Sequence, residues 1–158
     1  MIPLKINHTH LCQIFEPELD IAGWSDDAIQ SYSISKMMFP TSVALTSETY
    51  SRDAERTADY ELEHLTLINR KTKPEFVWGL IRREYVEKLM RFLNYTYGFK
   101  NAEGYIVPVD APTYVISYLD FTGTRTIHSY LGQTIEGTLE EYDGVQYWRD
   151  FRIAFPER

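Results

Sequence analysis

Apolar side chains at every second residue, the period of a half-buried β-strand, occur at the start of residues 60–68 and at Phe76, Trp78 and Leu80. Residues 113–121, 125–131, 134–142 and 145–155 are also interpreted as strands, because they flank short hairpin connections. Aromatic residues make up 15% of the chain, and together with the many threonines they favour pleated sheets over helices. The sequence therefore predicts a fold built mainly from strands, with further strands near 3–15 and 29–39.

Two short connections predict antiparallel hairpins. Asp143-Gly144 separates residues 134–142 from 145–155, and this dipeptide is the strongest two-residue hairpin signal. Thr122-Gly123-Thr124 separates the two preceding strands in the same way. The last third of the chain is therefore expected to form an antiparallel meander.

One segment, Arg82 to about Tyr97, has the period of a helix. Its apolar positions recur every four residues, at Tyr85, Leu89, Leu93 and Tyr97. Gly98 follows directly, and glycine is common just after the last turn of a helix. The sequence predicts a single α-helix over about 82–97.

The order of these elements indicates the fold class. Strands precede the helix, an antiparallel meander follows it, and no βαβ repeat occurs. We expect one domain over residues 1–158, of the mainly β or α+β class. Its sheets would form an antiparallel β-sandwich or a barrel-like arrangement, closed at one face or end by the helix.

Residues 40–59 fit neither period. The segment is polar and rich in Ser and Thr, and a loop of that length within one domain is often functional. Two interpretations stay open for 40–59: a flexible insertion, or a hairpin arm that becomes ordered against a neighbouring subunit. Residues 16–28 form a second irregular and acidic stretch.

The net charge is −7, which disfavours nonspecific binding to nucleic acid. The charge is unevenly distributed: residues 16–63 hold 11 acids and 3 bases, and residues 69–100 hold 8 bases and 3 acids. These charges can simply form solvated faces, which is the commoner case, or such a chain can neutralise itself internally or dock head-to-tail with its own copies.

The sequence contains no common catalytic or nucleotide-binding signature, such as GxSxG, HExxH, GxGxxG or GxxxxGK[ST]. Cys12 is the single cysteine. No stretch approaches 18 apolar residues, and the N-terminus lacks the pattern of a signal peptide. We assign no catalytic, cofactor-binding or metal-binding residues and no cofactor, and we expect a protein made in the cytoplasm that does not bind membranes.

Several polar residues could carry chemistry, but a structural interpretation fits each of them better. His8 and His10 would share one face of a strand, but a metal would need a third ligand such as His64 or His128. The neighbours Asp26-Asp27 and Glu140-Glu141 would point to opposite faces of a strand. Glu136 and Glu140 would share a face without a bulge, which is an ordinary arrangement on a sheet surface.

The three tryptophans could bind a sugar if they were exposed. Trp78 alternates with Phe76 and Leu80 and is expected in the core. Trp148 follows Tyr147 directly, so one of the two should face outward. Trp24 lies in the irregular acidic stretch and is the best candidate for an exposed aromatic ring.

The aromatic residues and glycines of roughly residues 60–158 recur in a recognisable pattern. The pattern is carried by Leu4-Lys5-Ile6-Asn7, Trp78, Val86, Leu89, Tyr118-Leu119-Asp120, Gly123, Tyr130-Leu131-Gly132, Tyr142-Asp143-Gly144, Trp148 to Phe155 and Pro156-Glu157-Arg158. It resembles a small uncharacterised family of tail-region proteins encoded by tailed bacteriophages and by prophages of Gram-positive bacteria. The acidic stretch and residues 40–59 depart from that pattern.

The resemblance implies the fold of phage tail-tube, tail-hub and distal-tail proteins, in which a long loop or hairpin bridges to the next subunit or ring. We therefore expect a non-enzymatic virion protein of the tail or head–tail connector. Its partners would be copies of itself, often in hexameric rings, and neighbouring tail proteins. It would assemble in the bacterial host cytoplasm and then reside in the virion, and DNA could pass through the ring without specific binding.

Two other functions stay open. One is a carbohydrate- or cell-surface-binding module that uses Trp24 or the pair Tyr147 and Trp148. The other is an enzyme in which carboxylates such as Glu136 and Glu140 converge in a cleft.

Overall fold

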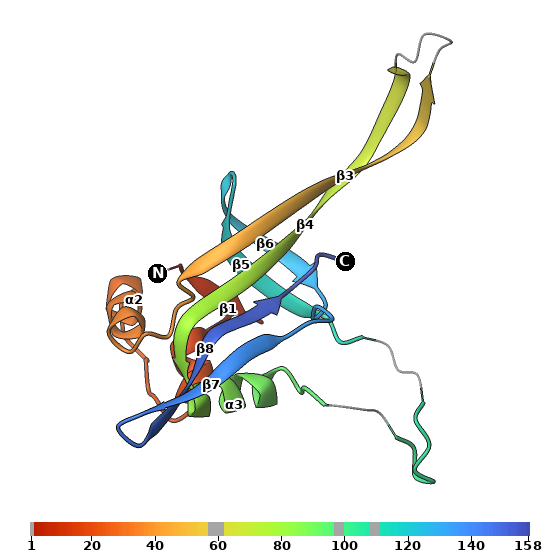
Figure 1. Cartoon of the computed structure of the whole chain (residues 1–158). Coiled ribbons are helices and arrows are strands. Elements are labelled where there is room, and N and C mark those ends of the chain that lie inside the picture. Colours follow the sequence, from red (N-terminus) through yellow and green to blue (C-terminus); the bar gives the residue numbers. More distant parts are fainter. Residues whose placement is uncertain (1, 57–61, 97–99, 108–110) are drawn as a thin grey trace.

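The fold consists of two four-stranded antiparallel sheets with short helices beside them (Figure 1). The computed structural model describes residues 2–56, 62–96, 100–107 and 111–158. Sheet A has the order β2-β1-β5-β6, and these strands are Thr9–His10, Leu4–Ile6, Tyr114–Asp120 and Gly123–Ser129. Sheet B has the order β3-β4-β8-β7, and these strands are Ser42–Arg56, Leu62–Arg82, Val145–Ala154 and Glu136–Tyr142.

This architecture confirms the predicted mainly β, α+β class. The two sheets resemble a sandwich, and over the described residues they do not close into a barrel. The described residues contain three helices where one was expected: α1 Leu11–Phe15, α2 Asp26–Ser35 and α3 Arg83–Phe92.

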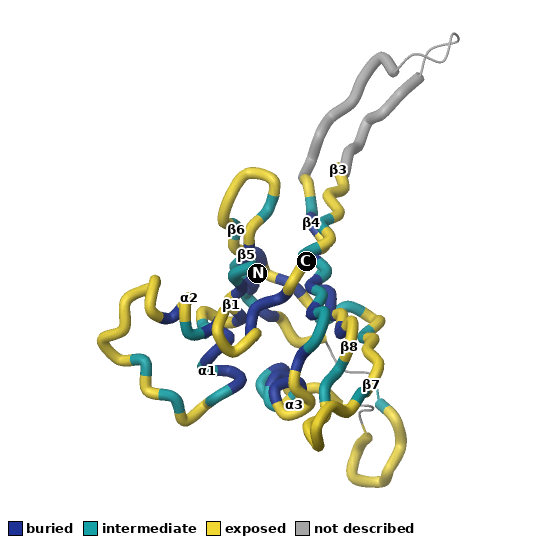
Figure 2. The backbone as a smooth tube through the Cα atoms, turned by 60° about the vertical axis from the view of Figure 1, so that its left-hand side comes forward, coloured by how far each residue is buried: buried dark blue, intermediate teal, exposed yellow. Residues whose placement is uncertain are grey.

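Large aromatic side chains from both sheets form the core. Phe76 on β4 packs edge-to-face against Tyr118 on β5, with ring centroids 6.1 Å apart. Trp78 is 1% exposed and donates an indole hydrogen bond of 2.8 Å to the carbonyl of Met38. Trp78 is therefore a core residue, as predicted, and Figure 2 shows the buried residues gathered in the body.

The alternation expected over 76–80 ends at Gly79. Phe76 and Trp78 are buried, but Leu80 is only half-buried and Ile81 takes the next core position at 2% exposure. On the neighbouring β8, Asp150 has a positive φ of 52°. Both strands thus change the face they present to the core at the same level of the sheet.

The prediction of a strand near 29–39 is wrong, because the helix α2 covers Asp26–Ser35. Ser25 caps this helix by accepting a hydrogen bond of 3.1 Å from the backbone of Ala28. Two acids, Asp26 and Asp27, lie in its first turn, where the helix dipole favours negative charge. The expectation near 3–15 is likewise corrected, because the short β1 and β2 are followed by α1.

The helix predicted over 82–97 is confirmed as α3 but is shorter. Tyr85, Val86 and Leu89 form its buried face, as the four-residue period indicated. Asn94 has a φ of 54°, in the left-handed region, and this conformation prevents continuation of the helix. Tyr97 and Gly98 lie outside the described residues.

The two hairpins of the last third are confirmed, but they do not form one meander, because β5 and β6 lie in sheet A whereas β7 and β8 lie in sheet B. Asp143 and Gly144 have φ values of 50° and 78° and form the two-residue turn between β7 and β8. The turn between β5 and β6 is centred on Phe121 and Thr122, one residue earlier than expected, because Asp120 pairs with Gly123.

The C-terminal segment joins the two sheets. Glu157 bridges to Ser129 at the end of β6, and its N–H donates 2.9 Å to the carbonyl of Thr72 on β4. Farther back, the N–H of Gly132 donates 2.8 Å to the carbonyl of Ala154. Sheet A and sheet B are therefore held together by backbone hydrogen bonds along one corner.

We expect Gly132→Ala to lower the free energy of unfolding by about 1–3 kcal/mol, because a close-packed site must deform to accept a methyl group. A Cβ at Gly132 would lie 3.0 Å from the Cβ and 3.1 Å from the carbonyl oxygen of Ala154. The matched control is Gly79→Ala, whose Cβ would meet only Thr41, at 3.6 Å or more. Urea denaturation of both variants measures the effect, and equal stabilities would contradict the prediction.

Candidate assembly interface

The longest feature of the molecule is the hairpin of β3 and β4, which extends beyond the body (Figure 1). β8 pairs with β4 only from Glu75 to Arg82, and the C-terminal segment reaches Thr72. Beyond that level β4 pairs with β3 alone among the described strands. About ten residues of each strand form this two-stranded arm, a length of about 33 Å.

Residues 40–59 are therefore largely strand and not an irregular loop. Ser42–Arg56 forms β3, and its pairs run from Ser42 opposite Val77 to Arg56 opposite Leu62. This segment has no apolar periodicity of its own. It forms a strand because it pairs with β4, which contains alternating apolar residues. The hairpin-arm interpretation fits this geometry, its contact with a neighbouring subunit stays a prediction, and residues 57–59 lie outside the described part of the chain.

Sheet B has two edge strands of different character. The first half of β3, Ser42–Thr49, pairs without a register shift and contains neither Pro nor Lys, and its one charged residue is Glu48. Proteins usually protect edge strands with such residues or with bulges. β7, the other edge, has three glutamates among seven residues. The β3 edge is thus the more open to pairing with another strand.

A polar network fixes the base of the arm to the body. The hydroxyls of Thr72 on β4 and Tyr118 on β5 are 2.6 Å apart. Arg125 on β6 donates to Thr72 at 3.0 Å and to both carboxylate oxygens of Glu157, at 2.9 and 3.1 Å. One terminal nitrogen of Arg125 contacts both carboxylate oxygens while the other bonds Thr72, and hydrogen bonds between charged groups are stronger than neutral ones. The network connects three strands and the C-terminal segment where the arm leaves the body.

The acids considered for catalysis have structural partners. Glu140 accepts a hydrogen bond of 2.7 Å from Arg149 and another from Tyr142. The bond from Arg149 is the main cause that holds the pKa of Glu140 below its usual value. Glu136 pairs across the strands with Arg152, and a register shift separates it from Thr138. Asp26 and Asp27 lie in the first turn of α2, where the helix dipole favours negative charge.

The histidines do not share one strand face as expected. His8 lies in a turn with a φ of 61°, whereas His10 belongs to β2. Both line a hollow of about 400 Å³ that also contains Lys5 and Asp26. His128 lies on β6, and the side chain of His64 is outside the described part. Among the described residues, no three His, Cys, Asp or Glu side chains are placed to hold a metal ion.

Trp24 is exposed and Trp78 is buried, as expected, whereas Tyr147 and Trp148 are both half-buried and neither is fully exposed. Trp24 is 37% exposed and contacts Tyr32 edge-on, with ring centroids 5.6 Å apart. Trp148 packs against the core, and the neighbouring Tyr147 lies half-buried with its ring 5.9 Å from that of Tyr142. Of the proposed sugar-binding rings, Trp24 alone combines exposure with a surface hollow, which Gly23, Ser25 and Tyr32 also line.

A second projection, between α3 and β5, was not predicted (Figure 1). Its outer turn is organised by the side chain of Asn101, which accepts hydrogen bonds of 3.0 Å from the backbones of Glu103 and Tyr105. Tyr105 and Ile106 are 70% and 78% exposed there. The Asn-Ala-Glu-Gly sequence is a turn signal that could have indicated this element.

No family model, curated protein or solved structure matches this chain. The resemblance to tail-region proteins of phages thus stays a prediction. Among the described residues, no helix has the length and apolar character needed to span a membrane.

We expect Glu157→Ala to lower the free energy of unfolding by about 1–3 kcal/mol, because Arg125 and Thr72 lose a shared acceptor. The Glu157 side chain is only 13% exposed. The control is Glu75→Ala, which removes a 3.5 Å ion pair to Arg152 at a more exposed position and should change stability by less than about 0.5 kcal/mol. Chemical denaturation compares the two, and a larger loss in the control would contradict this role of Glu157.

Proposed function

We propose that this chain is a non-enzymatic structural subunit of a bacteriophage virion. It would belong to the tail or the head–tail connector and would assemble with its own copies into a ring, hexameric as the sequence resemblance suggests. The observation that carries this proposal is sheet B, whose two edges are unpaired among the described strands and which continues into the two-stranded arm.

The strand directions of sheet B support a ring. Its four strands alternate in direction, so β3 and β7 run in opposite directions. If β3 of a second copy, in the same orientation, were placed beside β7, the antiparallel pattern would continue. This is a head-to-tail contact between two different surfaces, and such contacts generate rings when the rotation closes.

The edges β3 and β7 are offset along the strand direction, and this offset favours strands that are tilted relative to the axis of the proposed ring. β3 pairs with β4 from Leu62 to Val77, whereas the part of β8 that carries β7 lies beside Val77–Arg82. The two edges therefore occupy successive levels along the strand direction. Neighbouring copies can pair β3 with β7 only if the strands are inclined to the ring axis, as they are in closed barrels.

The two-stranded arm also favours contact with a neighbouring subunit. A two-stranded ribbon in water is marginally stable by itself, and three strands or a packed layer are normally required. The arm extends well beyond the last strand that covers it. Contact with another subunit would supply the missing neighbour, and neighbouring tail proteins could use the same surface.

The charge is compatible with a ring through which DNA passes. A net charge of −7 repels phosphates and leaves no reason for specific nucleic-acid binding. Assembly would take place in the cytoplasm of the bacterial host, followed by residence in the virion.

We expect the double variant Ala44→Lys/Thr46→Lys to abolish assembly, because lysines on an edge strand oppose strand pairing. Both positions are exposed on β3. The matched control is Thr124→Lys/His128→Lys on β6, an edge strand of sheet A with both positions exposed. Sedimentation velocity and electron microscopy over a wide concentration range compare the variants. Rings that persist in the β3 variant, or that disappear only in the β6 variant, would refute the β3 edge as the contact.

A second function, sugar or cell-surface binding, is favoured only by Trp24. Its ring lies beside Tyr32 at an open hollow, and exposed aromatic rings can stack on sugars. In that case Trp24→Ala would abolish binding on a glycan array, whereas Tyr105→Ala, at another exposed aromatic, would retain it. An array on which the unchanged protein binds nothing would eliminate this function.

A further inference from the structure

The two ends of β4 carry opposite charge. The segment 53–63 includes the last residues of β3 and the first residues of β4. It contains five acids and one base, a net charge of −4. The opposite end of β4 leads into α3, where residues 82–91 contain four bases and two acids. Because β4 has 21 residues, the two ends are about 70 Å apart.

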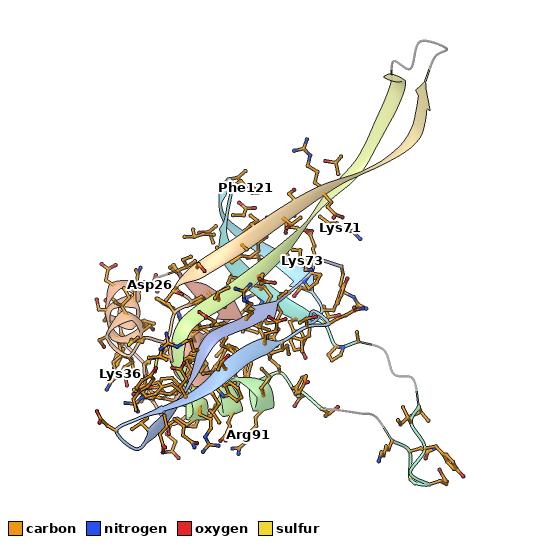
Figure 3. The ribbon with its side chains drawn as sticks, viewed as in Figure 1. Asp26, Lys36, Lys71, Lys73, Arg91 and Phe121 are labelled. Carbon is orange, nitrogen blue, oxygen red and sulfur yellow. The ribbon has the colours of Figure 1, made fainter. Side chains whose placement is uncertain are left out.

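At this basic end lies a pocket of about 420 Å³ between α2, the end of β4 and the start of α3. Three cationic side chains line it: Lys36, Arg82 and Lys88. Figure 3 places Lys36 at the end of the molecule away from the arm. Met37, Leu80, Ile81 and Tyr147 add an apolar surface.

The acids of this pocket are already engaged. Glu16 accepts hydrogen bonds from the hydroxyls of Tyr32, at 2.5 Å, and Tyr85, at 3.3 Å, and its bond raises the pKa of Tyr32 to about 12. Glu84 accepts a hydrogen bond of 3.2 Å from Arg82. Among the described residues, no carboxylate lies within ion-pair distance of Lys36 or Lys88. The two ammonium groups are therefore available to an outside carboxylate.

We infer that this pocket receives the acidic segment 53–63 of another copy of the chain. The occupant is identified by complementary charge, since no other stretch of 11 residues in the sequence contains as many acids. The arm of the same copy cannot reach the pocket, because it leaves from the opposite end of β4. The contact therefore joins copies end to end, in a direction different from the edge-to-edge contact within a ring.

This inference rests on the proposed function, and it adds the residues through which one ring would contact the next. Ion pairs of this kind screen readily, so end-to-end association should weaken as the salt concentration rises. Edge pairing within a ring depends on backbone hydrogen bonds and should persist at salt concentrations that separate the rings.

The test uses the full chain and a zero-length carbodiimide cross-linker, applied to an equal mixture of isotopically light and heavy protein. We expect mixed-isotope cross-links between acids of 53–63 and Lys36 or Lys88. Lys36→Glu/Lys88→Glu should shorten stacked assemblies at least fivefold in electron micrographs. Arg91→Glu/Lys100→Glu makes the same charge change outside the pocket and should leave the stack length within twofold of the unchanged protein.

A charge exchange makes the test decisive. Adding Asp59→Lys/Glu61→Lys to the pocket variant should restore both stacking and cross-links, now with the reactive groups exchanged. Rings that form without cross-links from 53–63 to the pocket would overturn this inference alone. Absence of any association, even at the highest soluble concentration, would overturn both this inference and the ring.

Discussion

The backbone hydrogen bonds of the C-terminal segment are the interaction on which the rest of the molecule depends. Glu157 lies between Thr72 of sheet B and Ser129 of sheet A, and its carboxylate accepts from Arg125. This corner supplies the backbone hydrogen bond by which the C-terminal segment links β4 of sheet B to the end of β6 of sheet A. The corner also sets the level at which β4 loses its other neighbours, and the arm begins there.

The sequence contained enough information for the class of fold but not for the arm. β5 could be located because one of its faces packs on the core, whereas β7, which is almost wholly exposed, was located by the Asp143-Gly144 turn that follows it. Residues 42–56 show no alternation, since polar residues dominate the segment, so nothing local marked β3 as a strand. Its structure comes from pairing with β4, a contact that single-sequence patterns do not reveal. The α2 error differs, because Ser25 and the acids after it form a helix start signal that the sequence did provide.

The candidate interface follows from topology more than from residue type. Neither edge of sheet B contains a motif. The polar residues that could act in catalysis have structural roles instead: Glu140 bonds to Arg149, and Asp26 lies in the first turn of α2. β3 is distinguished by its neighbours: its first half pairs with β4 without a register shift on one side, and none of the described strands pairs with its other side. Relations of this kind appear only once the strand order is known, which is why no site residue could be assigned beforehand.

The two proposed contacts act along different directions of the molecule. The edge contact would repeat sideways and would not depend on the ends of β4, whereas contact between the acidic segment 53–63 and the cationic pocket would repeat along the strand direction. Because the two contacts would use different surfaces and different forces, neither would require the other to form first. A sheet with an even number of antiparallel strands, and with opposite charge at the two ends of its longest strand, would therefore provide both directions of growth that the proposed stacked ring needs.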